Sequence, residues 1–149
     1  MTETLLVTHI LSAAAWIGGG FFNGFVGPRM AKAGGESALT WLRVVLDASL
    51  KFFLPAGIVT LLSGMLLVIV DDTYEWGDLF VGIGMAVVVI AVIVVFTVMV
   101  PSTRRALIAA EGGDFPNVGV NARRAALGGQ VIAVLLVLTE IAMVIRLGV

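Results

Sequence analysis

The sequence has no cysteine and little charge. Only 13% of its 149 residues are charged, against roughly 25% in a soluble domain. Without cysteine, disulfides, thiolate metal sites and thiol catalysis are excluded. Nine Lys and Arg residues are balanced by ten Asp and Glu residues, so the chain lacks the basic excess that nucleic-acid binding requires. We therefore expect no nucleic-acid partner.

Apolar residues take the place of the missing charge and make up 60% of the chain. Four stretches each reach the length of about 20 residues that a helix needs to cross a bilayer. They cover residues 5–26, 49–70, 79–100 and 127–147. The sequence therefore predicts an all-α integral membrane four-helix bundle, a single transmembrane domain over residues 1–149 that is surrounded by membrane lipid.

The links between the predicted spans differ in charge. The links after the first and third spans are basic, whereas the short link at 71–78 contains no Lys or Arg. The basic residues are Arg29, Lys32, Arg43, Arg104, Arg105, Arg123 and Arg124. Because basic loops stay in the cytoplasm, we expect two basic cytoplasmic loops, with both termini and the acidic link outside. This predicts a multi-pass protein of a bacterial-type inner (cytoplasmic) membrane.

The segment at 37–47, before the second span, admits two interpretations. It is amphipathic enough to lie along the cytoplasmic interface, with Trp41 as an anchor. Equally, it continues the second span as one longer helix. Lys51 follows near the cytoplasmic end of that span, where its side chain can reach the surface and Asp47, at i−4, is placed to pair with it.

Two ionisable residues, His9 and Glu140, lie deeper in the predicted spans. They are roughly 6 and 10 Å below the outer ends of the first and fourth spans. A carboxylate at that depth costs about 3 kcal/mol unless it is paired or protonated. We therefore expect Glu140 to face the bundle interior and to pair with His9, water or a partner subunit. Such a pair is either part of a functional site or a helix-to-helix hydrogen bond without chemistry.

One face of the first span carries the only histidine together with tryptophan and glycine. His9, Trp16, Gly20 and Gly24 recur there at helical spacing. Gly20 and Gly24 form a G-x-x-x-G motif, which permits close helix packing in lipid. The glycine run at 18–20 stays helical, because a backbone in lipid must keep its hydrogen bonds. We expect another helix, or a flat cofactor, to approach this surface below Trp16.

The spacing His9-x6-Trp16-x-Gly18-Gly19 resembles the opening of the first helix in the copper-resistance-D and HemJ-type superfamily of small membrane proteins. The resemblance implies a helical bundle with haem or copper chemistry near His9. HemJ-type members are haem-dependent oxidases that act on protoporphyrinogen, and the copper-resistance branch is associated with copper passage. By this resemblance His9 is the axial or metal ligand, and Trp16 with Gly18-Gly19 shapes its pocket.

A second pattern, Lys51 followed by Ser63-Gly64, is also similar to that superfamily, and it implies that Lys51 meets a carboxylate. The single histidine excludes haem ligation by two histidines of one chain. It leaves His9 with a methionine, or two copies of His9 across a dimer. The methionines at a suitable depth are Met65, Met85 and Met143.

The candidate site therefore rests on few residues. The candidate cofactor-binding residues are His9, Trp16, Gly19, Gly20, Met85 and Glu140. Haem b is the first candidate cofactor, with copper or a quinone as alternatives in the same pocket. In this interpretation the protein is a haem- or copper-associated redox or metal-handling protein. The alternative is a non-catalytic accessory subunit of a larger respiratory or photosynthetic complex. Other membrane subunits or a second copy of the chain are the expected partners.

Overall fold

The computed structural model describes residues 2–145 and shows helices and no strand in that range. Four long helices have the length and apolarity to cross a membrane, which confirms the predicted all-α four-helix architecture. The first is α1 (Thr2–Ala33) and the last is α6 (Phe115–Val144). The second joins α2 (Gly35–Ala48), η1 (Ser49–Phe53) and α3 (Leu54–Val70). The third joins α4 (Leu79–Val94), η2 (Val95–Met99) and α5 (Val100–Glu111).

These helices extend well beyond the predicted spans. The segments that carry the basic residues, predicted as loops, are the helical ends of α1 and α6 together with α2 and α5. Hydropathy detects only the apolar part of a helix, so a polar helical extension looks like a loop in the sequence. Residues 146 and 147, the end of the predicted fourth span, lie outside the described residues.

The second and third long helices each contain one π-helical turn just before a proline. In η1 the N–H of Leu54 donates to the carbonyl of Ser49, and in η2 the N–H of Val100 donates to that of Val95. Pro55 and Pro101 follow these donors directly. Proline lacks an N–H and its ring clashes with the carbonyl four residues earlier, so the wider π turn relieves the helix at that point.

Short turns join the helices at the basic end of the bundle. Gly34 (φ 69°) and Gly35 (φ 54°) make the tight α1–α2 turn in a backbone conformation that favours glycine. Between α5 and α6, the side chain of Asp114 caps α6 by accepting from the N–H of Asn117. An ion pair of 3.0 Å between Arg43 and Glu111 links α2 to α5.

The segment at 37–47 is continuous with the second membrane helix. It is therefore an extension of that helix, which is the second of the two interpretations above.

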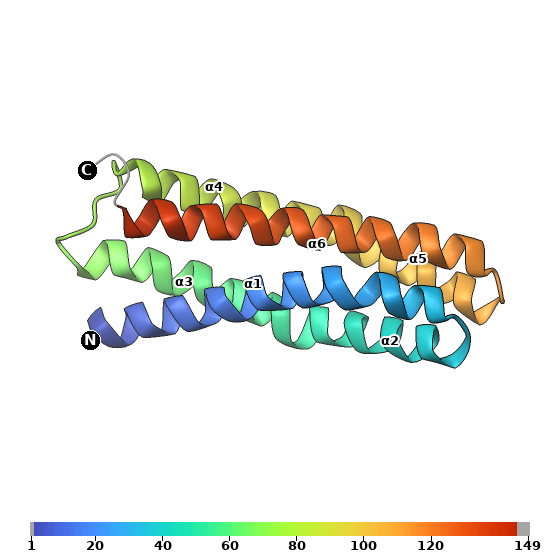
Figure 1. The fold of residues 1–149 in the computed structure, drawn as a ribbon. Helices are drawn as coiled ribbons and strands as arrows, with labels where there is room; N and C mark the ends of the chain where they lie inside the picture. Colours follow the sequence, from blue (N-terminus) through green and yellow to red (C-terminus); the bar gives the residue numbers. More distant parts are fainter. Residues whose placement is uncertain (1, 146–149) are drawn as a thin grey trace.

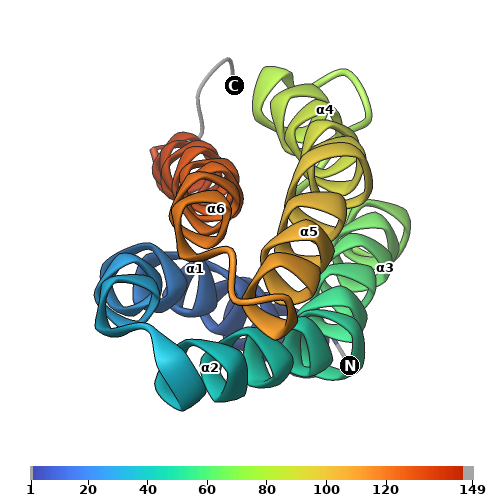
Figure 2. The same ribbon diagram turned by 90° about the vertical axis from the view of Figure 1, so that its right-hand side faces the viewer.

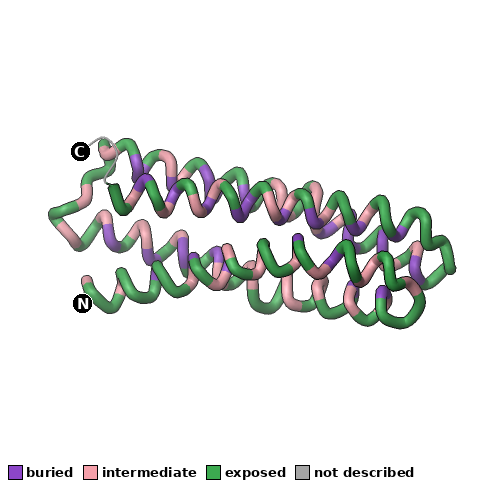
Figure 3. Tube along the Cα trace, in the orientation of Figure 1, coloured by how far each residue is buried: buried purple, intermediate pink, exposed green. Residues whose placement is uncertain are grey.

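The bundle is closed at one end and open at the other (Figures 1 and 2). At the basic end, α1, α2, α5 and α6 pack in a ring. Towards the opposite end α3 packs on α1, α1 on α6 and α6 on α4, whereas α3 and α4 contact each other little. Figure 3 shows buried positions along the inward faces and exposed ones around the outside. The exposed positions include large apolar side chains such as Phe22, Ile69 and Val131, as expected of helices that face lipid.

Candidate functional site

A cleft of about 360 Å³ lies at the open end, where α3 and α4 separate. All four long helices contribute to its walls, together with Tyr74 and Trp76 from the link between α3 and α4. The walls are mostly apolar. Of the residues predicted from the sequence, His9, Met85 and Glu140 line this cleft.

His9 is 8% exposed and is held by α3. Its Nδ1 lies 2.8 Å from the main-chain oxygen of Thr60 and 3.2 Å from Oγ of Ser63. A carbonyl oxygen only accepts, so Nδ1 carries the proton and donates. The hydroxyl of Ser63 itself donates to the carbonyl of Val59 at 2.6 Å and therefore accepts from His9.

This arrangement fixes the tautomer of the neutral imidazole. With the proton on Nδ1, the lone pair is on Nε2. Within residues 2–145, Nε2 of His9 has no hydrogen-bond partner. A ring nitrogen tied to a backbone carbonyl, with the other nitrogen available, is the usual preparation of a histidine for a metal or for a hydrogen-bond donor.

Two glycines of α3 make room for the two rings of α1. A Cβ atom on Gly64 would lie 2.9 Å from Cε1 of His9, and one on Gly57 would lie 2.9 Å from the indole of Trp16. His9 and Trp16 are seven residues apart on α1, and Gly57 and Gly64 are seven residues apart on the antiparallel α3. Each ring therefore lies opposite its own glycine. The sequence reasoning included Gly64 through a resemblance and missed Gly57, which has no local signal.

The three methionines considered at this depth all reach the cleft. Met65 comes from α3, Met85 from α4 and Met143 from α6, and His9 comes from α1. Each of the four long helices therefore supplies one soft or imidazole donor to the same space. No i, i+4 spacing connects them in the sequence, because they come from different helices.

Glu140 lines the cleft but does not pair with His9. Its carboxylate makes no hydrogen bond or ion pair with any residue in the range 2–145. The expected His9–Glu140 contact is absent, and Nδ1 of His9 is instead bound to Thr60 and Ser63 on α3. Glu140 is thus a carboxyl group at a mostly apolar cleft, without a partner among residues 2–145.

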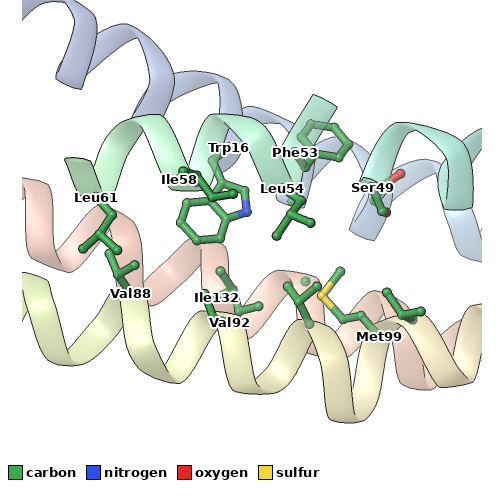
Figure 4. Close-up of a pocket in the computed structure, with 17 residues that line it drawn as sticks. Trp16, Ser49, Phe53, Leu54, Ile58, Leu61, Val88, Val92, Met99 and Ile132 are labelled. Carbon is green, nitrogen blue, oxygen red and sulfur yellow. The ribbon is translucent and has the colours of Figure 1, made fainter. Parts of the chain in front are cut away.

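Trp16, Gly19 and Gly20 line a second, smaller cavity of about 70 Å³, deeper in the bundle. Figure 4 shows Trp16 pointing from α1 into this cavity, towards Ile132 and Val92. Leu61 and Val88 line both cavities and lie between them. The six residues predicted as one site are therefore divided between two cavities.

Two glycines of the run at 18–20, Gly19 and Gly20, pack against protein. A Cβ on Gly19 would overlap the ring of Phe53, and one on Gly20 would lie 3.0 Å from the carbonyl oxygen of Gly129 on α6. Gly24 packs equally closely on Gln130. The glycine surface thus receives α6 and Phe53, where the sequence left open a helix or a flat cofactor.

Lys51 lies on the outer surface and does not line the cleft. It precedes Thr60, the first cleft residue of α3, by nine residues. It forms the ion pair with Asp47 that the i−4 spacing indicated, at 2.7 Å, with both side chains exposed. Its carboxylate partner is therefore a residue of the same helix.

Comparison with models of known protein families found no match, and neither did comparison with curated proteins or with solved structures. The part of the chain described here, residues 2–145, contains no group of three or more His, Cys, Asp and Glu side chains that could hold a metal ion.

Haem b and copper(I) place different demands on these residues. A haem b carries two carboxylates, and no Lys or Arg is among the described residues that line the cleft. The acidic residues at this end are Glu3, Asp71, Asp72, Glu75, Asp78 and Glu140. Their charge opposes a dianionic ligand, so the described residues do not fit haem b. Copper(I) prefers thioether and imidazole donors, and His9 with three methionines supplies that set.

Proposed function

We propose that the protein is an integral membrane metal-handling protein that binds copper(I) in the cleft at the open end. The observation that carries the proposal is the convergence of one donor from each long helix on this cleft: His9, Met65, Met85 and Met143. The sequence favours a metal near His9, and the methionines extend the candidate donor set to soft ligands.

The residues around the donors support the same assignment. The Nδ1–H of His9 is bound to the carbonyl of Thr60, which leaves Nε2 as the basic nitrogen. Glu140 adds negative charge that favours a cation. The apolar walls exclude water and suit the weakly hydrated, soft ion. A bound copper(I) would supply one-electron redox chemistry or be passed on as cargo.

The test is a titration of the purified protein with Cu(I) under anaerobic, reducing conditions against a chromogenic Cu(I) chelator. We expect the wild-type protein to withdraw one equivalent. His9→Ala and the triple change of Met65, Met85 and Met143 to Leu should each weaken binding by more than about 10-fold, the low end of the effect of losing even an outer-shell partner.

Met30→Leu is the matched control, because Met30 lies at the basic end, away from the cleft. Leucine replaces methionine with little change in volume, so the triple variant should fold. Equal Cu(I) binding by the triple variant and the wild type would overturn the proposal, as would no withdrawal of Cu(I) by the wild type.

A second candidate ligand, a quinol, is favoured by the size and the opening of the cleft. A volume of about 360 Å³ falls in the range of roughly 300–1,000 Å³ typical of small-molecule sites. The separation of α3 and α4 opens a path from the bilayer. A quinol hydroxyl would donate to Nε2 of His9, the acceptor that the fixed tautomer provides.

Calorimetric titration with a short-chain quinol separates the two ligands. If the cleft is a quinol site, binding is weakened by His9→Ala and kept in the triple Met→Leu variant. If it is a copper(I) site, the triple variant loses Cu(I) and the wild type does not bind the quinol. The expected role as an accessory subunit has a separate test, which is co-purification with a larger complex at fixed stoichiometry.

A further inference from the structure

A groove of about 730 Å³ lies at the basic end, between α1 and the first half of α6. Its charged lining residues are Lys32 on α1 and Arg123 on α6. Apolar side chains, among them Phe115 and Leu127, form much of the remaining surface. The groove is separate from the cleft and from the cavity beside Trp16, and nothing in the proposed function uses it.

The two cations in this groove have no acidic partner. No Asp or Glu lines the groove, and neither Lys32 nor Arg123 forms an ion pair with another residue of the described chain. Both side chains are exposed. By contrast, Arg43 at the same end is paired with the carboxylate of Glu111. The groove therefore offers uncompensated positive charge above an apolar surface.

The depth of the groove matches the boundary of the membrane. Gly24 packs on Gln130, which places α1 and α6 in antiparallel register at the deep end of the groove. Arg123 is seven residues from Gln130, or about 10 Å along the helix. The apolar spans begin and end near residues 26 and 127, so Lys32 and Arg123 lie at headgroup level and Leu127 at the level of the acyl chains.

We propose that this groove binds an anionic phospholipid. Its phosphate lies between Lys32 and Arg123, where charge-assisted hydrogen bonds are available, and one acyl chain follows the groove past Leu127. Basic pockets between membrane helices on the cytoplasmic side recognise anionic headgroups in this way. The occupant is a lipid because the charged and the apolar parts of the groove are continuous and match the two parts of such a molecule.

Native mass spectrometry of the purified protein, exchanged into micelles that contain phosphatidylglycerol or phosphatidylcholine, tests the proposal. We expect retained phosphatidylglycerol on the wild type and at least a several-fold loss in the double variant Lys32→Gln, Arg123→Gln. The matched control is Arg104→Gln, Arg105→Gln, which removes the same charge from α5 outside the groove. The control should retain the lipid.

A further variant tests the groove without changing any charge. A Cβ on Gly119 would meet no atom within 4 Å, so Gly119→Leu fills the groove and should also reduce lipid retention. The proposal is overturned if both double variants lose lipid equally or if phosphatidylcholine is retained as well as phosphatidylglycerol. Release of the lipid by inorganic phosphate at equal ionic strength would identify a free-anion site and would overturn the lipid assignment too.

Discussion

Three consecutive glycines of α1 have three different surroundings. Gly18 is exposed on the outside of the bundle, Gly19 lies under the ring of Phe53, and Gly20 packs on the backbone of α6. A helix turns by about 100° per residue, so neighbours in sequence face different parts of the molecule. Only two of the three glycines are therefore required by packing.

This difference predicts opposite effects of the same substitution at adjacent positions. Gly18→Ala should be neutral or raise the free energy of unfolding by up to about 1 kcal/mol, because alanine restricts the unfolded chain. Gly19→Ala should lower it by about 1–3 kcal/mol, the usual cost of overpacking, since Phe53 must move. Thermal unfolding in detergent measures both. Equal stability of the two variants would contradict the packing described for Phe53.

At the level of the helix, each of the two π turns directly precedes a proline, although Pro28 lies inside α1 without one. Pro55 and Pro101 each follow a widened turn, whereas Pro116 lies in the first turn of α6, where no helical N–H bond is lost. A π turn holds one residue more than the α-helix it interrupts. The position of each π turn along the chain therefore determines which faces of α3 and α4 are turned towards the cleft.

The extra residue can be tested by deletion. Removal of Phe52, an exposed residue of η1, should be tolerated because the π turn can revert to an α turn and keep the register on both sides. Removal of Leu62, which is similarly exposed but lies in α3, rotates every later residue of α3 by about 100° and separates Gly64 from His9. Yield of folded protein and thermal unfolding report the difference. A deletion of Leu62 that is no worse than that of Phe52 would contradict this assignment.

For the whole molecule, the described Lys and Arg residues lie towards the closed end, apart from Lys51 near the middle of the second long helix, and the acidic link lies at the open end. The first described turn of α1 and the last of α6 lie at the open end as well (Figure 1). This separation of charge is what the positive-inside rule uses to orient a membrane protein. By that rule we expect the closed end to face the cytoplasm and the cleft to face away from it.

The absence of cysteine makes that orientation easy to test. Ser37→Cys places one thiol on α2 at the closed end, and Thr73→Cys places one on the acidic link, both at exposed positions. A membrane-impermeant maleimide should label Thr73→Cys in intact cells and Ser37→Cys only after permeabilisation. The reverse labelling pattern, or labelling of both from one side, would contradict the orientation.

The sequence was sufficient for features that depend on local spacing. The four long helices, the close packing at Gly20 and Gly24 and the pair of Lys51 with Asp47 all follow from hydropathy or from i, i+4 relations. Among the polar helix extensions, only that at 37–47 was one of the predicted alternatives; the others and the π turns were not predicted, because hydropathy has no signal for them.

The composition of the cleft could not be predicted in the same way. Met65 and Met143 are 78 positions apart in the sequence. They line the same cleft only because the helices pack as they do. The partner of His9 was also beyond the sequence, since it is a main-chain carbonyl, which every residue possesses. Of the partners expected for Glu140, His9 is not bound to it in the described residues, and water or a partner subunit stays a prediction.

The main-chain acceptor of His9 has a mechanical consequence. No side-chain substitution at Thr60 can remove its main-chain carbonyl, so the hydrogen bond from Nδ1 depends on how α1 and α3 lie relative to each other. The π turn of η1 directly precedes α3, and migration of its extra residue along the chain would slide and rotate that helix. A shift of α3 would therefore change the hydrogen bond that holds the imidazole of His9. The π turn and Pro55 at the start of α3 set the position from which such a shift would begin.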